Sequence, residues 1–123
     1  MTYSGKELAA LVGMAINMAA ADGQVDKTER EVIVKELANF GVDGFQAAQI
    51  LMKAKDMEAS ESIETISQMD IEQKKYVTGF LAAIMIADGN IEDSEVSLWK
   101  FVSMICNLPT MDLAEALEFW TKN

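Results

Sequence analysis

The chain has 123 residues, is 50% apolar and carries a formal net charge of −10 at pH 7. A chain of this length forms one domain that buries roughly two-thirds of its unfolded surface without a stabilising metal or disulfide. The acidic excess disfavours nucleic acid and anionic membranes as partners. The absence of histidine excludes His-based catalysis and imidazole metal sites, and the single cysteine excludes an internal disulfide.

Apolar residues recur at helical spacing along the chain, and no stretch alternates as a strand does. We therefore predict an all-α fold of about seven helices. The first helix opens with a capping box of Ser4 and Glu7 and ends at Gly23. Because more than one of its faces is apolar, we expect it to be central and buried.

The second helix is predicted to start with a capping box of Asp26 and Glu29 and to stop at Gly41. A third helix begins after Asp43. Its predicted apolar side carries Phe45, Ala48, Leu51 and Met52. Residues 56–69 then form a polar link with a short helix that contains Ile63, Ile66 and Met69.

The next predicted helix is capped by Asp70 with Gln73 and is the counterpart of the first. Glu92 and Glu95 start a further helix, which Asn107 ends because asparagine tolerates the left-handed conformation. The buried side of that helix is predicted to contain Leu98, Trp99, Val102, Ile105 and Cys106. Pro109 and Thr110 are predicted to start the last helix, which carries Leu113, Ala116, Leu117 and Trp120.

One acidic turn occurs twice, at residues 21–29 and 87–95, with a constant offset of 66 residues. The helix stops at Gly41 and Asn107 follow the same offset. We therefore predict one domain, residues 1–123, with internal duplication and pseudo-two-fold symmetry. The first repeat spans 4–55, the link 56–69 and the second repeat 70–122.

These turns resemble the hallmark of the tellurite-resistance TerB-like family, an apolar helix that ends in Ala-Asp-Gly before a hydrophobic residue and a later Glu. The matching residues are Ala87, Asp88, Gly89, Ile91 and Glu95 in one copy, and Ala21, Asp22, Gly23, Val25 and Glu29 in the other. The resemblance covers most of the chain. It implies a seven-helix fold, an association with stress response or metal-anion resistance, and a metal role for the acidic turns.

Six carboxylates in the two turns are the candidate metal ligands, and oxygen-only groups suit calcium, magnesium or manganese. They are Asp22, Asp26, Glu29, Asp88, Glu92 and Glu95. The spacing is not that of an EF-hand, because Lys27 and Asp93 stand where that loop requires glycine. The alternative is structural, since carboxylates at helix starts bond to free backbone N–H groups.

Other features favour ordinary structural roles. Cys106 is predicted to be an inert thiol in the core. Two acidic runs are predicted to be solvated helix faces that could instead dock a basic partner: Glu58, Glu61 and Glu64, and Asp112, Glu115 and Glu118. The nine methionines are mostly core filler, although a Met-rich groove would suit a partner helix.

The leading interpretation is a non-enzymatic, stress-associated interaction or scaffold module with a protein partner. The alternatives are a divalent-cation binding protein and, least favoured, a carboxylate-based enzyme. No cofactor is predicted beyond that alternative cation, and a homo-oligomer stays open. The apolar runs at residues 8–21 and 76–87 are too short to cross a membrane, so we expect a soluble cytoplasmic protein without membrane insertion.

Overall fold

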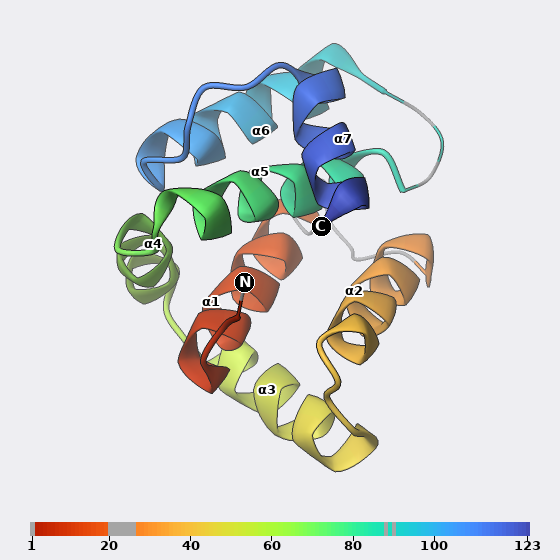
Figure 1. Cartoon of the computed structure of the whole chain (residues 1–123), viewed down its shortest axis with the longest axis vertical. Coiled ribbons are helices and arrows are strands. Elements are labelled where there is room, and N and C mark those ends of the chain that lie inside the picture. Colours follow the sequence, from red (N-terminus) through yellow and green to blue (C-terminus); the bar gives the residue numbers. More distant parts are fainter. Residues whose placement is uncertain (1, 20–26, 88, 90) are drawn as a thin grey trace.

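Seven helices make up the part of the chain that the computed structural model describes, namely residues 2–19, 27–87, 89 and 91–123. Within these residues there is no strand, so the predicted all-α class is confirmed. Figure 1 shows their arrangement. The helices are α1 (Gly5–Ala19), α2 (Lys27–Asn39), α3 (Gly44–Asp56), α4 (Ala59–Ser67), α5 (Ile71–Met85), α6 (Asp93–Ile105) and α7 (Leu113–Lys122).

The centre of the fold is formed by α1 and α5. Helix α1 packs against α3, α4 and α5, while α5 also packs against α2, α6 and α7. All residues from Leu8 to Ala15 on α1 and from Tyr76 to Met85 on α5 are buried. Because a helix that is apolar on several faces needs neighbours on several sides, the predicted central position of the first helix is confirmed.

Capping boxes explain where several helices begin. Ser4 Oγ accepts a hydrogen bond from the Glu7 N–H at 3.1 Å, and Glu7 Oε1 accepts one from the Ser4 N–H at 2.8 Å. Asp43 and Asp70 form the same reciprocal box with a glutamine at the starts of α3 and α5. Each box satisfies backbone donors that the first turn leaves without an intrahelical acceptor.

The helix stops at Gly41 and Asn107 have the predicted left-handed backbone, with φ of 73° and 54°. After each stop, the N–H of Val42 or Leu108 donates to the carbonyl five residues earlier, at 3.3 Å and 2.8 Å. This bond satisfies a carbonyl that the last turn would otherwise leave without a donor. The internal duplication and its domain boundaries depend on more than these two helix ends and stay predictions.

The link between the predicted repeats contains α4, as expected. Ile66 and Met69 are buried, and α4 packs against α1. Its acidic residues Glu58, Glu61 and Glu64 are exposed, which confirms a solvated face. Among the described residues, no helix is both long and apolar enough to span a bilayer.

The last helix starts later than predicted. Asp112 Oδ1 accepts from the Glu115 N–H at 2.8 Å, and the Asp112 N–H donates to Glu115 Oε1 at 3.3 Å, so these acids cap α7. The predicted start at Pro109 and Thr110 is wrong, because residues 108–112 form no regular structure before this box. Asp112 and Glu115 therefore have a structural role and are more than a solvated face.

Candidate functional site

The acids of the two predicted turns are only partly covered by the described residues. Glu92 and Glu95 stand at the start of α6. The other four calls, the residues Asp22, Asp26 and Asp88 and the side chain of Glu29, lie outside the described residues. Among the side chains that are described, no group of three or more His, Cys, Asp or Glu residues could hold a metal ion. The metal site of all six acids therefore stays a prediction.

Glu92 occupies the N-cap position of α6, but its side chain makes no capping hydrogen bond. The predicted capping role of this carboxylate is therefore wrong. Asp43, Asp70 and Asp112 all accept the N–H three residues further on. Aspartate is a preferred N-cap because its short side chain reaches that donor, whereas glutamate carries an additional methylene. Glu95 is half-buried in the first turn, where negative charge complements the helix dipole.

The metal hypothesis can be tested by thermal melting. If the acidic turns bind calcium, magnesium or manganese, millimolar metal is expected to raise the Tm, because a ligand that binds the folded state stabilises it by about 2.7 kcal/mol at 100-fold its Kd. The double variant Asp22→Asn, Asp88→Asn should lose this rise. The control Glu58→Gln, Glu61→Gln removes the same charge from the N-cap and first turn of α4 and should keep the rise. Unchanged melting curves with all three ions would contradict the hypothesis.

One carboxylate that the sequence analysis missed is buried where three helices meet. Glu36 of α2 is 1% exposed. Its Oε1 accepts a hydrogen bond from the Tyr76 hydroxyl of α5, and its Oε2 accepts one from Trp120 Nε1 of α7 at 3.1 Å. Burial raises the pKa of Glu36 above its usual value, while the hydrogen bonds from Tyr76 and Trp120 oppose that rise. Glu36 therefore ties α2 to both α5 and α7.

Aromatic rings surround this carboxylate. Phe40 packs edge-on against Tyr3 and Tyr76, with ring centroids 5.2 Å and 5.7 Å apart. The Tyr3 hydroxyl donates to the backbone oxygen of Gln73 at 2.9 Å. Burial is the main cause that raises the pKa of both Tyr3 and Tyr76, so the two phenols are neutral at physiological pH.

A cavity of about 570 Å³ opens beside Glu36 and lies within the usual size range of small-molecule sites. We call it the Glu36 cavity. Its lining comes from α2, α5 and α7, from Phe40 after α2 and from Asn123 after α7. The lining residues are Val32, Lys35, Glu36, Asn39, Phe40, Tyr76, Trp120, Thr121 and Asn123.

The sequence contains a signal for this site. Glu36 lies four residues after Val32 and four before Phe40, so helical spacing places it on the apolar face of α2. An acid at such a position must find buried donors or change its protonation state. Glu36 lies inside a helix, so it is not among the acids of the two turns.

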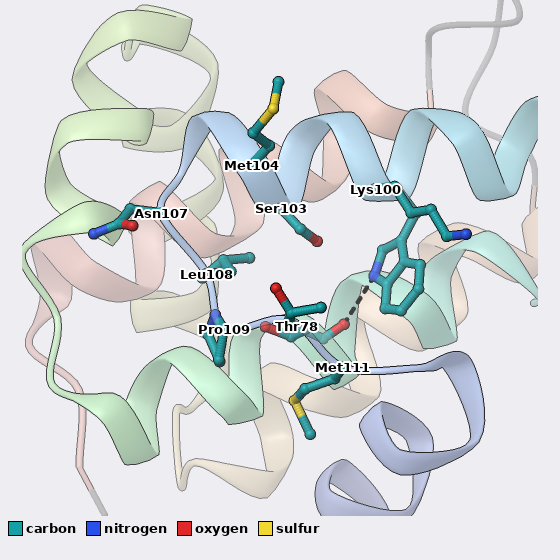
Figure 2. Close-up of a pocket in the computed structure, with 10 residues that line it drawn as sticks. Thr78, Lys100, Ser103, Met104, Asn107, Leu108, Pro109 and Met111 are labelled. Carbon is teal, nitrogen blue, oxygen red and sulfur yellow. Dashed lines mark hydrogen bonds between the residues drawn. The ribbon is translucent and has the colours of Figure 1, made fainter.

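A second hollow, the Trp99 groove, lies between α5, α6 and the segment before α7 (Figure 2). Its volume is about 490 Å³. Trp99 Nε1 donates to the Thr78 backbone oxygen at 3.1 Å. Figure 2 shows the Ser103 hydroxyl pointing toward the groove, and this oxygen has no hydrogen-bond partner among the described residues. The groove also has apolar lining from Met104, Leu108, Pro109 and Met111.

Beside this groove, α6 exposes an apolar stripe to solvent. The α6 stripe consists of Phe101, Met104 and Ile105, which are 51%, 70% and 36% exposed. The predicted burial of Ile105 is therefore wrong. Trp99, Val102 and Cys106 were correctly predicted to be buried. Helix α6 packs against α5 and α1 through its other side, so this stripe contacts no described neighbour that would bury it.

Helix α3 carries a second exposed stripe. The α3 stripe consists of Phe45, Ala48 and Met52, with Phe45 75% and Met52 68% exposed. Helical spacing predicts that these residues share one side of the helix, but it does not determine whether that side is buried. Helix α3 packs on α1 instead, with Ala54 buried on the packed side. Figure 1 places α3 and α6 toward opposite ends of the molecule.

The single thiol lies in the core. Cys106 is fully buried, and this burial raises its pKa to about 11. Because the thiolate is the reactive form, a raised pKa keeps the thiol unreactive at neutral pH. The predicted inert core cysteine is consistent with this environment.

Comparison with known proteins identifies the family. The model of the tellurite resistance protein TerB matches residues 8–118. The chain is also similar to a protein of unknown function from Porphyromonas gingivalis W83, whose crystal structure is known. The two sequences are 40% identical, and the structures superpose with a TM-score of 0.89. The match covers 100% of this chain and 99% of that chain. No curated protein matches the sequence. The family model and the shared fold show that the chain belongs to the tellurite resistance TerB family.

Proposed function

We propose that this protein is a non-enzymatic, stress-associated scaffold module that binds a protein partner through the α6 stripe and the adjoining Trp99 groove. The family description names tellurite resistance, which supports the stress association. The observation that carries the proposal is the exposure of Phe101, Met104 and Ile105 on one face of α6. Contiguous apolar side chains on a surface are typical of protein interaction sites.

The groove supports the same proposal. Met104 belongs both to the α6 stripe and to the lining of the groove, where Met111 lies as well. Flexible, polarisable methionine side chains adapt to different partner surfaces. An amphipathic helix that places its apolar face against α6 is therefore a fitting partner.

The net charge of the chain favours a partner of opposite charge. The chain has a net charge of −10, so a second copy is repelled and a basic segment is attracted. The α3 stripe, which lies toward the other end of the molecule, provides a second apolar surface. Two separate surfaces of this kind suit a scaffold that joins two partners. The absence of histidine and the buried, high-pKa thiol support a role without catalysis.

Two synthetic peptides of roughly 18 residues, five helical turns, test the proposal. Both carry the same apolar residues at helical spacing, but one has lysines and the other glutamates on its polar face. The lysine peptide is expected to bind saturably by isothermal titration calorimetry. The double variant Phe101→Ser, Met104→Ser should weaken binding at least about tenfold, a loss of about 1.4 kcal/mol.

The matched control is Val34→Ser, Ile71→Ser, because these residues are 59% and 54% exposed but lie outside both stripes. This control should bind like the unmodified protein. Circular dichroism establishes that each variant is folded. If the lysine peptide fails to bind, or binds the α6 variant with unchanged affinity, the proposed docking surface is wrong.

A further inference from the structure

We propose that the Glu36 cavity is a binding site for a primary alkylammonium group, the chemistry shared by a lysine side chain and a free alkylamine. The site is separate from the α6 stripe and is independent of the function proposed above. It combines a buried carboxylate, an aromatic lining and a cavity of about 570 Å³.

The carboxylate supplies the negative charge. Glu36 is 1% exposed, and both of its oxygens accept hydrogen bonds from cavity-lining side chains, Tyr76 and Trp120. Both donors are neutral, so they orient the carboxylate without cancelling its charge. The ion pair found among the described residues joins Lys122 to Glu118. Glu36 has no ion-pair partner among these residues. A buried charge without a counter-ion is costly, and a cation in the adjacent cavity would offset that cost.

The aromatic lining supplies a second attraction for the same ligand. Phe40, Tyr76 and Trp120 all line the cavity. The negative faces of aromatic rings attract organic cations, and the effect increases when the cation leaves water. The hydrocarbon part of an alkylammonium ion also gains from burial against these rings and Val32. A metal ion would have to bind a carboxylate whose two oxygens already accept hydrogen bonds.

The charge of the surroundings modulates the site. Lys35 lines the cavity and is exposed, so its ammonium opposes the entry of another cation. The net charge of −10 acts in the other direction and raises the local concentration of cations. Removal of Lys35 is therefore expected to strengthen binding, whereas removal of the Glu36 charge should weaken it.

The test uses n-butylammonium chloride and follows the two tryptophan indole N–H signals by NMR. The Trp120 signal, assigned with Trp120→Phe, is expected to shift saturably, because Trp120 Nε1 bonds to Glu36. The Trp99 signal is an internal control, since Trp99 bonds to Thr78 and lines the other hollow. Sodium chloride at equal ionic strength and n-butanol, a neutral analogue, should produce no saturable shift.

Three variants decide the outcome. Glu36→Gln should weaken n-butylammonium binding at least about tenfold. Glu31→Gln, which removes the same charge from an exposed position on α2, should leave it unchanged. Lys35→Met should tighten it severalfold, and this variant tests the proposal even if Glu36→Gln were to unfold. Unchanged affinity in both Glu36→Gln and Lys35→Met, or an equal shift with n-butanol, would overturn the proposal.

A parallel titration with N-acetyl-lysine methylamide distinguishes the sources of the cation. Tighter binding of this compound than of n-butylammonium indicates a lysine of a protein partner as the ligand. Tighter binding of n-butylammonium indicates a free amine. Both results support the site. If neither compound binds saturably, the proposal is contradicted.

Discussion

Gly79→Ala is expected to lower the free energy of unfolding by about 3 kcal/mol or more, the upper part of the range for overpacked cores. A Cβ at this position of α5 would lie 2.2 Å from the backbone oxygen of Ala116 and 2.5 Å from Trp120 Cβ. The closest of these atoms belongs to the backbone of α7, so no side-chain rotation relieves the contact. Helix α7 would have to move away from α5, and Trp120 would move with it.

Urea denaturation measures this effect, and Gly44→Ala is the matched control. No atom lies within 4 Å of a Cβ built at Gly44, the first residue of α3. This substitution is expected to stabilise the fold by about 0.5 kcal/mol through the reduced entropy of the unfolded chain. In the Gly79 variant, a changed NMR chemical shift of the Trp120 indole N–H, which donates to Glu36, would indicate the displacement of α7. Stability within about 1 kcal/mol of the unmodified protein would instead show that α5 and α7 can separate at little cost.

Glu36→Gln is expected to raise the Tm at pH 8, with a gain that shrinks as the pH falls toward 4.5. Burial raises the folded-state pKa of Glu36 above 4.5, its ordinary value. At a pH between the ordinary pKa and the raised folded-state pKa, Glu36 holds a proton in the folded chain that it has released in the unfolded chain. The stability contributed by protonated Glu36 is thus complete below about pH 4.5 and is lost as the pH rises through the folded-state pKa. Glutamine does not titrate, so it avoids this loss.

Neighbouring groups do not reproduce this pH dependence. Tyr3 and Tyr76 face the carboxyl, but burial keeps their pKa values above the range tested. Glu31→Gln corrects for the change in net charge. A Tm gain that is equal at every pH would show that the ionisation of Glu36 is not its cause. A lower Tm for Glu36→Gln at pH 8 would show that the ionised carboxylate stabilises the fold.

A second substitution separates the hydrogen bonds of Glu36 from its charge. The glutamine amide oxygen can accept from Trp120 while its NH₂ group donates to the Tyr76 hydroxyl. Leucine leaves both partners unpaired. Glu36→Leu is therefore expected to be about 2 kcal/mol less stable than Glu36→Gln, about 1 kcal/mol for each hydrogen bond. Equal stability of the two variants in urea would contradict a structural role for these bonds.

Much of the fold was predictable because its signals act over a few residues. The capping boxes of Asp43 and Asp70 join groups three residues apart, and the left-handed stops at Gly41 and Asn107 depend on local backbone freedom. The start of α7 was missed for a local reason as well. The capping box of Asp112 and Glu115, not Pro109, begins this helix.

The candidate sites were less predictable, because the distances between their parts in the sequence are large. Glu36 is 40 residues from Tyr76 and 84 from Trp120, so only the packing of α2, α5 and α7 brings the three side chains together. Its place on an apolar face was visible, but its partners were not. The six acids of the turns were predicted from a repeated pattern. Of these, the Glu92 side chain does not make the predicted cap, Glu95 lies in the first turn of α6, and the side chains of the other four lie outside the described residues.

From the sequence alone it follows that the chain is helical, where most helices start and stop, and that the first helix is buried at the centre. These properties follow from side-chain period and short-range hydrogen bonds. Tertiary structure alone decided which apolar faces of α3 and α6 remain exposed, and that Glu36 is enclosed. Helical spacing shows which residues share a face, but the number and position of neighbouring helices decide which of those faces are covered.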